Sequence, residues 1–397
     1  MISLFMWSDN WWIENDEAWF VGGMQNILFN LNLKTNECES AVSIPEEVSS
    51  KFRLTPFCIK CEDDIFCMPD NGNNIWTYNI SSKCFSNIGI ENPNKVRIGI
   101  NDFWRDDNKL FAVSNGLNQV IEINITEKKI ENCYVLSRKG NISKSIKVGT
   151  DIYSLSGMFG EIYQFDMITK EISLYRLPDI GRKFSTFCFD GEKFWLSGYY
   201  KEVYVWNKEE NKLMILNSFP MEFGIYNFTK NTDGKIDCTT NHYELPTFLY
   251  ALAVDDNIWF VPLQTNKIIY VNVQNYEIQT FEITEENETK ESLLERTSLC
   301  YKYILEYIQG NRYIGLFSIK NNCIIEIDAL EKKAKMKYYT LGQKCVCETA
   351  NILYDGYVFY EGDVTQKQFY ITMLNQNTKK AGNLMDRIGL KIYEMMI

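Results

Sequence analysis

A short strand-like pattern that recurs along the whole chain limits its fold more than any other feature. The clearest copy, residues 257–272, reads Asn-Ile-Trp-Phe-Val-Pro-Leu-Gln-Thr-Asn-Lys-Ile-Ile-Tyr-Val-Asn, with two apolar runs joined by a polar link. The second run always ends on an Asx residue, at Asn32, Asn79, Asn124, Asp166, Asn207, Asn272, Asp328 and, in a weaker copy, Asn375. Most of these positions are about 40 to 50 residues apart, a period typical of repeat proteins.

Each repeat is rich in β-branched and aromatic residues and is interrupted by turns, which indicates strands. About thirteen residues before six of the Asx positions stands an aromatic residue on the preceding strand, namely Trp19, Phe66, Phe111, Tyr153, Trp195 and Trp259. The seventh copy is blurred around Tyr313 and Ile314. After each Asx comes a short polar turn, and an Asx side chain favours chain reversal because it can bond the backbone two residues on.

Four strands in a repeat of this length predict the blade of a β-propeller. We therefore expect an all-β protein with one propeller domain over residues 1–397. The eight motif copies favour eight blades, with seven as the alternative because the eighth copy is weak and seven-bladed rings are common. The apolar residues 1–6 are a candidate strand for closing the ring, and 381–397 has the apolar spacing of a short C-terminal helix.

Composition restricts the class of protein and its partners. The 397 residues are 45% hydrophobic and carry a net charge of −11, with no clustered Lys/Arg run, so nucleic-acid binding is not expected. No long apolar run predicts a membrane span, and the N-terminus does not resemble a signal peptide. The twelve cysteines lack the spacing of a disulfide framework, so we expect free, mostly buried thiols and a cytosolic location. We also expect a monomer without a cofactor.

Two insertions interrupt the regular spacing, and both lie between the outer strand of one repeat and the inner strand of the next. The first, residues 221–246, contains Asp233-Gly234 between alternating runs, which predicts a β-hairpin. The second, residues 284–298, is acidic and favours a helix. Links of this kind emerge on one face of a propeller, so we expect the two insertions side by side there.

The first insertion supplies the candidate ligand-binding residues Tyr226, His242, Tyr243 and Glu244, which combine rings with polar tips. His242 is the one histidine of the chain and stands beside a carboxylate, so it is a candidate acid or base, although an exposed loop histidine has the same pattern. Residues 229–240 faintly resemble a calcium-binding loop, but Thr229 and Thr240 stand where such a loop has its acidic first and last ligands. Cys58 and Cys61 would fall on opposite faces of one strand, which argues against a zinc site.

The repeat consensus, with Asp256-Asn-Ile-Trp-Phe260 followed by Asn266-Lys-Ile-Ile-Tyr-Val-Asn272, resembles the blades of bacterial propellers of the streptogramin B lyase type. The resemblance covers most of the chain and implies the propeller fold. That family uses a pair of histidines, a glutamate and a magnesium ion, and this chain has His242 alone, so the family's site is not carried over. Kelch and WD-repeat signatures are also missing as a series.

Two functions of different classes remain open at this stage. The first is a non-enzymatic binding or scaffold propeller that recognises a protein or small-molecule partner on the face carrying the 221–246 and 284–298 insertions. The second is a lyase or hydrolase acting on a small cyclic or sugar-like substrate in the central channel. Inward carboxylates holding a metal would favour the second.

Overall fold

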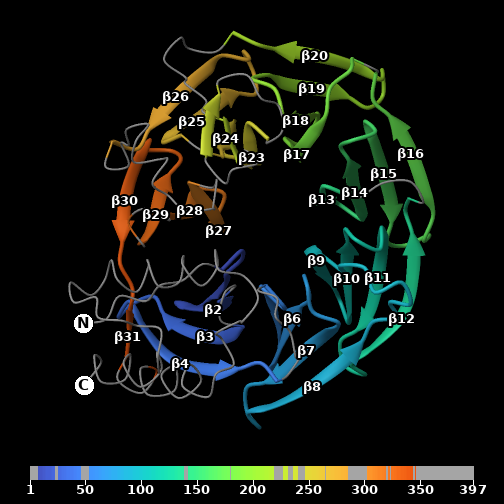
Figure 1. Ribbon diagram of the computed structural model, residues 1–397, viewed down its shortest axis with the longest axis vertical. Coiled ribbons are helices and arrows are strands. Elements are labelled where there is room, and N and C mark those ends of the chain that lie inside the picture. The colour runs from blue at the N-terminus through green and yellow to red at the C-terminus, as the bar shows by residue number, and fades with distance from the viewer. Residues whose placement is uncertain are drawn as a thin grey trace.

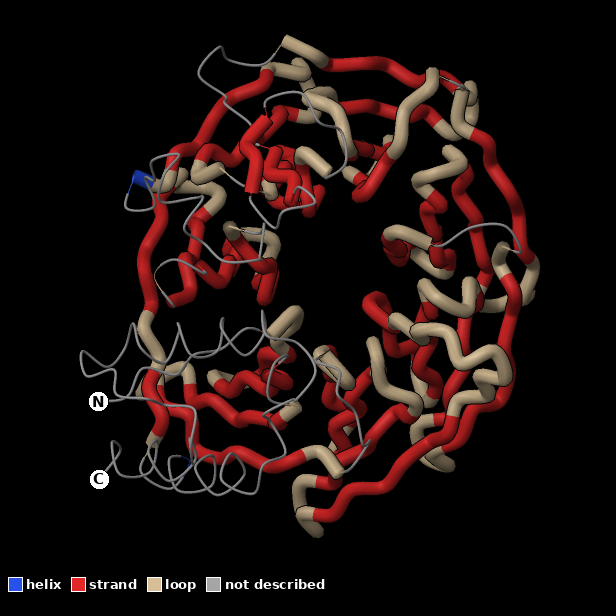
Figure 2. Tube along the Cα trace, viewed as in Figure 1, coloured by secondary structure: helices blue, strands red, loops and turns tan. Residues whose placement is uncertain are grey.

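In the computed structural model, seven antiparallel sheets are arranged as a ring around a central opening (Figure 1). The structure describes residues 8–22, 26–45, 53–137, 142–178, 180–218, 227–230, 236–239, 246–263, 265–284, 302–318, 321, 323–342 and 345. In each sheet four consecutive strands pair in chain order, the first beside the opening and the fourth at the rim (Figure 2). The predicted all-β propeller of four-stranded blades is confirmed.

The strands of each blade run from the inside of the ring to its rim. Blade 1 has β1 (Trp12–Glu14), β2 (Glu17–Gly22), β3 (Ile27–Asn32) and β4 (Glu37–Ser43); blade 2 has β5 (Phe57–Cys61), β6 (Asp64–Met68), β7 (Asn74–Asn79) and β8 (Cys84–Gly89). Blade 3 has β9 (Ile100–Asp106), β10 (Lys109–Ser114), β11 (Gln119–Asn124) and β12 (Lys129–Val135); blade 4 has β13 (Lys144–Val148), β14 (Asp151–Ser156), β15 (Glu161–Asp166) and β16 (Ile172–Arg176). Blade 5 has β17 (Phe184–Phe189), β18 (Phe194–Gly198), β19 (Val203–Asn207) and β20 (Lys212–Leu216). Blade 6 has β23 (Phe248–Val254), β24 (Asn257–Pro262), β25 (Lys267–Asn272) and β26 (Ile278–Glu282); blade 7 has β27 (Tyr303–Gln309), β28 (Tyr313–Ser318), β29 (Cys323–Asp328) and β30 (Lys333–Lys337).

The prediction of eight blades is wrong, and the alternative of seven is right. The eighth motif copy, residues 369–375, lies outside the described residues, as does the predicted C-terminal helix at 381–397. The seventh blade meets the first directly: the Trp11 backbone nitrogen donates a 2.7 Å hydrogen bond to the carbonyl oxygen of Glu306 in β27. The motif reports local strand and turn structure, whereas the number of blades depends on where the ring closes.

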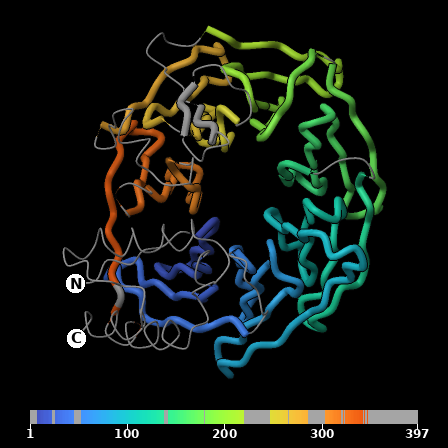
Figure 3. Tube along the Cα trace, viewed as in Figure 1, coloured from blue at the N-terminus to red at the C-terminus, as the bar shows by residue number. Residues whose placement is uncertain are grey.

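A short strand also crosses between the two ends of the ring. After blade 7 the chain forms β31 (Thr340–Leu341), which pairs in parallel with the outermost strand of blade 1, β4 (Figure 3). Blade 1 therefore has a fifth strand covering its outer edge, and such covering protects unpaired backbone groups. The apolar residues 1–6 proposed for closure lie outside the described residues.

The Asx residues act in the turns as the sequence predicts. In all seven blades the Asx side-chain oxygen accepts a hydrogen bond from the backbone N–H two or three residues later. At Asp166, for example, Oδ1 accepts from the backbone nitrogens of Ile168 at 2.7 Å and Thr169 at 3.0 Å. The residue four places after each Asx has a positive φ, including Lys170 (65°) and Tyr276 (60°). The side-chain bonds stabilise the reversal that joins the third strand of a blade to its fourth.

The hydrophobic core lies between neighbouring blades. The six aromatic residues predicted from the spacing are all on second strands and all buried. In blade 7 the corresponding position is Gly315, and a Cβ there would lie 2.3 Å from Cε1 of Tyr307 on the adjacent strand β27. A bulge in β27 brings this ring inward, so the aromatic group comes from the first strand of the blade. This exchange explains why the seventh motif copy is blurred.

The first insertion contains the predicted hairpin, formed by β21 (Asn227–Lys230) and β22 (Ile236–Thr239). It lies between the outer strand β20 and the inner strand β23, as expected. The second insertion lies between β26 and β27, and beyond Thr284 it is outside the described residues. Within the described part of the chain, no helix has the length and apolar character needed to cross a membrane.

Candidate functional site

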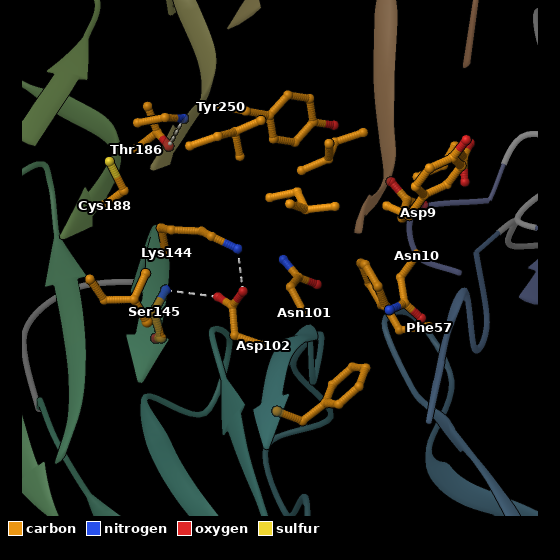
Figure 4. A pocket seen from close by; sticks show the side chains of 18 of the residues that line it. Asp9, Asn10, Phe57, Asn101, Asp102, Lys144, Ser145, Thr186, Cys188 and Tyr250 are labelled. Atoms are coloured by element: carbon orange, nitrogen blue, oxygen red, sulfur yellow. Dashed lines mark hydrogen bonds and ion pairs between the residues drawn. The ribbon is translucent and has the colours of Figure 1, made fainter. Parts of the chain in front are cut away.

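The inner strands of all seven blades enclose a central cavity of about 1030 Å³ (Figure 4). Its wall is formed by β1, β5, β9, β13, β17, β23 and β27, so each blade contributes one strand. The polar side chains at the cavity come mainly from the start of these strands, next to the links that arrive from the preceding blade. The cavity wall thus carries both polar and apolar side chains, held on strands of all seven blades.

Three of the polar side chains bond the neighbouring blade in the same way. Asn10 Oδ1 accepts from Cys58 N at 3.0 Å, Asp102 Oδ2 accepts from Ser145 N at 2.7 Å, and Thr186 Oγ1 accepts from Ala251 N at 3.0 Å. Each bond runs from an odd-numbered blade to the first strand of the next blade. These contacts fix the spacing of the inner strands and orient the residues beside them.

Asp102 and Lys144 form an ion pair across the boundary between blades 3 and 4. The Lys144 ammonium donates to Asp102 Oδ1, and the Asp102 side chain is 5% exposed while that of Lys144 is 38% exposed. An ammonium has three N–H donors, so the bond to Asp102 leaves donor capacity on the cavity side. Asn101 lies between Lys144 and Phe57 in Figure 4, and its buried Oδ1 has no hydrogen-bond partner among the described residues. The pair and the amide together can bind a polar ligand group.

At the edge of the cavity, Arg53 joins two carboxylates from different parts of the ring. It contacts Asp9 at 2.8 Å and Asp70 at 2.9 Å, and Asp70 also binds Arg97. Burial lowers the pKa of Arg53, but the charges and hydrogen bonds of Asp9 and Asp70 more than offset this and raise the pKa above its ordinary value. The positive charges of the two arginines thus offset the negative charges of the two carboxylates. The cluster connects the links that enter blades 1 to 3.

Besides Asp9 and Asp102, one more carboxyl group lines the cavity. It belongs to Glu306, which is buried at the junction of blades 7 and 1. Burial raises its pKa well above the ordinary value, and the hydrogen bonds from the Ser8 hydroxyl and backbone nitrogen offset this only in part. The negative charge of Asp9 raises it further. The raised pKa favours the neutral form of Glu306, and its polar atoms serve the closure of the ring.

The predicted site residues Tyr226, His242, Tyr243 and Glu244 lie outside the described residues, so the structure does not bring them together or separate them. The described parts of their insertion, β21 and β22, precede β23, whose residues Leu249–Ala253 line the cavity. Across the described ranges no group of three His, Cys, Asp or Glu side chains is arranged to hold a metal ion. Cys58 and Cys61 belong to different core clusters, which confirms that they face opposite sides of β5.

Sequence reasoning missed Asn101, Asp102 and Lys144. A signal for them exists in the repeat: Asp102 and Lys144 each stand nine residues before the second-strand aromatic of their own blade, as do Asn10 and Thr186. In the folded ring this position is near the start of the inner strand, at the boundary with a neighbouring blade. The offset of nine residues from the aromatic residue therefore identifies these side chains once the order of the strands in each blade is known.

Comparison with known proteins supports the fold. No family model matches the chain, and no curated protein matches it by sequence. Among solved structures, a streptogramin B lyase shares 13% identity with a TM-score of 0.55, covering 85% of this chain and 96% of the other. An inactive virginiamycin B lyase from Staphylococcus aureus, solved with quinupristin, shares 11% identity with a TM-score of 0.54, covering 79% and 94%. The computationally designed protein Ika8 shares 7% identity with a TM-score of 0.53, covering 85% and 91%. The chain is therefore similar to lyase-type propellers in fold, and at these identities the likeness reaches no further.

Proposed function

We propose that this protein is a non-enzymatic binding propeller that recognises a protein or small-molecule partner at the mouth of its central cavity. The mouth concerned is on the face that carries the 221–246 and 284–298 insertions. The observation that carries the proposal is the cavity of about 1030 Å³ in which the buried Asn101 Oδ1 has no hydrogen-bond partner among the described residues. Concave sites of this size with a few converging polar groups are the usual form of ligand sites.

The charges around the cavity suggest the chemistry of the ligand. Asp102 is paired with Lys144, Asp9 is paired with Arg53, and the raised pKa of Glu306 favours its neutral form. A strongly charged ligand would have to compete with these partners. An uncharged polar group, such as an amide or a hydroxyl, can instead bond both Asn101 and Lys144 while the existing pairs remain.

The position of the insertions supports the same face. Each links an outer strand to the next inner strand, and β23 and β27, which follow them, both line the cavity. Loops extended beyond what a connection needs are disproportionately functional. We propose that Tyr226, His242, Tyr243 and Glu244 contact the partner from this side.

A thermal-shift screen of the full-length protein with neutral amide and polyol compounds tests the proposal. We expect a stabilising compound whose effect is lost in Asn101→Ala and reduced in Lys144→Met. Lys212→Met is the matched control, because this lysine is 78% exposed on the outermost strand of blade 5. Stabilisation that is equal in all four proteins would contradict the proposal.

The same experiment separates binding from catalysis. If the stabilising compound is recovered unchanged after incubation with the protein, as mass spectrometry can show, the binding function stands. Conversion of the compound to a product would favour the alternative of a lyase or hydrolase. A cytosolic, monomeric state also remains a proposal, and light scattering during size exclusion would test the monomer.

A further inference from the structure

Two cysteines from opposite ends of the chain meet at the seam of the ring. The sulfur atoms of Cys38 and Cys345 are 3.3 Å apart, although the residues are 307 positions apart in sequence. Both side chains are completely buried, and neither sulfur atom is in a disulfide bond. Two thiols in van der Waals contact need only a small local movement to form a disulfide bond.

The backbone around Cys38 holds the other end of the chain close. Cys38 lies in β4 opposite Leu341 of β31, and the Gly342 nitrogen donates to the Cys38 carbonyl oxygen at 2.9 Å. A Cβ on Gly342 would lie 2.9 Å from that same oxygen, so the close approach requires glycine. The closing segment (residues 340–342) is therefore fitted to β4 at the position of the cysteine.

The same segment pairs with β4 over a short length. Its strand consists of two residues, and its ladder pairs Thr340 with Glu37 and Leu341 with Cys38. Short edge strands open at low free-energy cost compared with the core of a domain. A covalent bond beside this strand would reinforce its two-residue ladder.

We propose that Cys38 and Cys345 are a redox modification site whose disulfide joins blade 1 to the segment that follows blade 7. The oxidant is a low-molecular-weight disulfide of the glutathione type. When the closing segment opens, the Cys345 thiolate attacks this disulfide, its S–S bond breaks, and one small thiolate leaves. The Cys38 thiolate then attacks Cys345 in the mixed disulfide and releases the second small thiolate. The two cysteines lose two electrons and two protons, and the small disulfide becomes two thiols.

The bond has a physical consequence for the whole ring. It closes a loop of about three hundred residues, and cross-links that close long loops remove the most entropy from the unfolded chain. Oxidation therefore stabilises the protein and prevents release of the closing segment from β4. Reduction restores the free thiols and the reversible, hydrogen-bonded seam.

The test uses the full-length protein with its twelve cysteines. It is incubated with oxidised glutathione, blocked with N-ethylmaleimide and analysed by non-reducing peptide mapping and intact mass. We expect a peptide joining Cys38 to Cys345, a loss of two titratable thiols, and a rise in the unfolding midpoint on the order of a few °C that dithiothreitol reverses. Cys345→Ser should abolish the linked peptide and the rise.

The exposed residues Cys84 and Cys133 supply the control, because Cys84→Ser/Cys133→Ser should keep both effects. Cys58 stands opposite Cys67 in neighbouring strands and is the main competing pair. A map of the oxidised wild-type protein with Cys58 linked to Cys67 and no Cys38–Cys345 peptide would overturn the proposal. The map needs no variant, so its result is decisive even if a substitution at Cys38 prevents folding.

Discussion

The backbone nitrogen of Trp11 donates a 2.7 Å hydrogen bond to the carbonyl oxygen of Glu306, and this bond joins the first blade to the last. The Glu306 side chain accepts from Ser8 in the same place, so one residue of blade 7 holds the N-terminal segment through both its backbone and its carboxyl group. The stability of the ring should therefore depend on the state of this residue.

The raised pKa of Glu306 predicts a pH dependence. The folded protein keeps a proton that the unfolded chain releases above the ordinary carboxyl pKa of 4.5, so stability falls as pH rises from there towards the folded-state pKa. Glu306→Gln removes this titration while keeping a side chain that can accept from Ser8. The variant should gain stability over the wild type as the pH rises above the ordinary carboxyl value, by at most about 1.4 kcal/mol per pH unit. Urea unfolding of both proteins across this range measures the difference, and a constant difference would show that Glu306 does not titrate as described.

Trp11 should be a major contributor to closure. The residue is 5% exposed. The centroid of its ring lies 5.0 Å from that of Phe20, on which it stacks, and 5.5 Å from that of Tyr307 in blade 7. Trp11→Ala should lower the free energy of unfolding by about 3–5 kcal/mol because it leaves a cavity at the seam. Phe159→Ala, at a 55% exposed ring, should change it by less than about 0.5 kcal/mol. Equal effects of the two substitutions in denaturant unfolding would contradict the described seam.

The exchange between Gly315 and Tyr307 can be tested directly. Gly315→Ala places a methyl group against the Tyr307 ring and should cost about 1–3 kcal/mol of stability. Tyr307→Leu makes room for it, so the double variant should lose less than the sum of the two single losses. Gly89→Ala is the control, since the nearest atom to its Cβ would be 3.9 Å away. Additive losses in the double variant would mean that the two residues do not share this space.

The ion pair of Asp102 and Lys144 should couple blades 3 and 4. Asp102→Asn keeps an oxygen for the Ser145 nitrogen and removes the charge, and Lys144→Met removes the ammonium. A double-mutant cycle should give a coupling of about 1 kcal/mol, because Lys144 is partly exposed and solvent weakens the attraction. Adding salt should reduce the coupling, and a value of zero at low salt would show that the pair does not form in solution.

The parts of the fold that the sequence predicts are those set by local contacts. Asp166 marks a turn because its side chain bonds Ile168 and Thr169, and such bonds need no information from the rest of the ring. The hairpin at Asp233-Gly234 is predictable for the same reason. Blade number is different, because it depends on where Trp11 meets Glu306, a contact between distant residues.

The cavity residues were not predictable in the same way. Asn101 and Lys144 come from different blades and become neighbours only when seven inner strands are assembled. Their residue types alone, an amide and a lysine, are ordinary surface residues in a linear sequence. Gly315 shows the reverse problem, since its role became clear only from the position of the Tyr307 ring.

We propose that the partner binds at the cavity mouth, on the face that carries the insertion containing β21 and β22. The most direct measurement is partner binding by the full-length protein and by a variant in which residues 226–240 are replaced by a short Gly-Ser link. We expect the variant to keep its unfolding midpoint and its β-rich circular-dichroism spectrum, because the hairpin is outside the seven blades. Binding of the partner, recovered by pull-down from the native host and quantified by titration, should weaken at least about tenfold, a loss of roughly 1.4 kcal/mol. Unchanged affinity in a correctly folded variant would contradict the claim and place the site elsewhere.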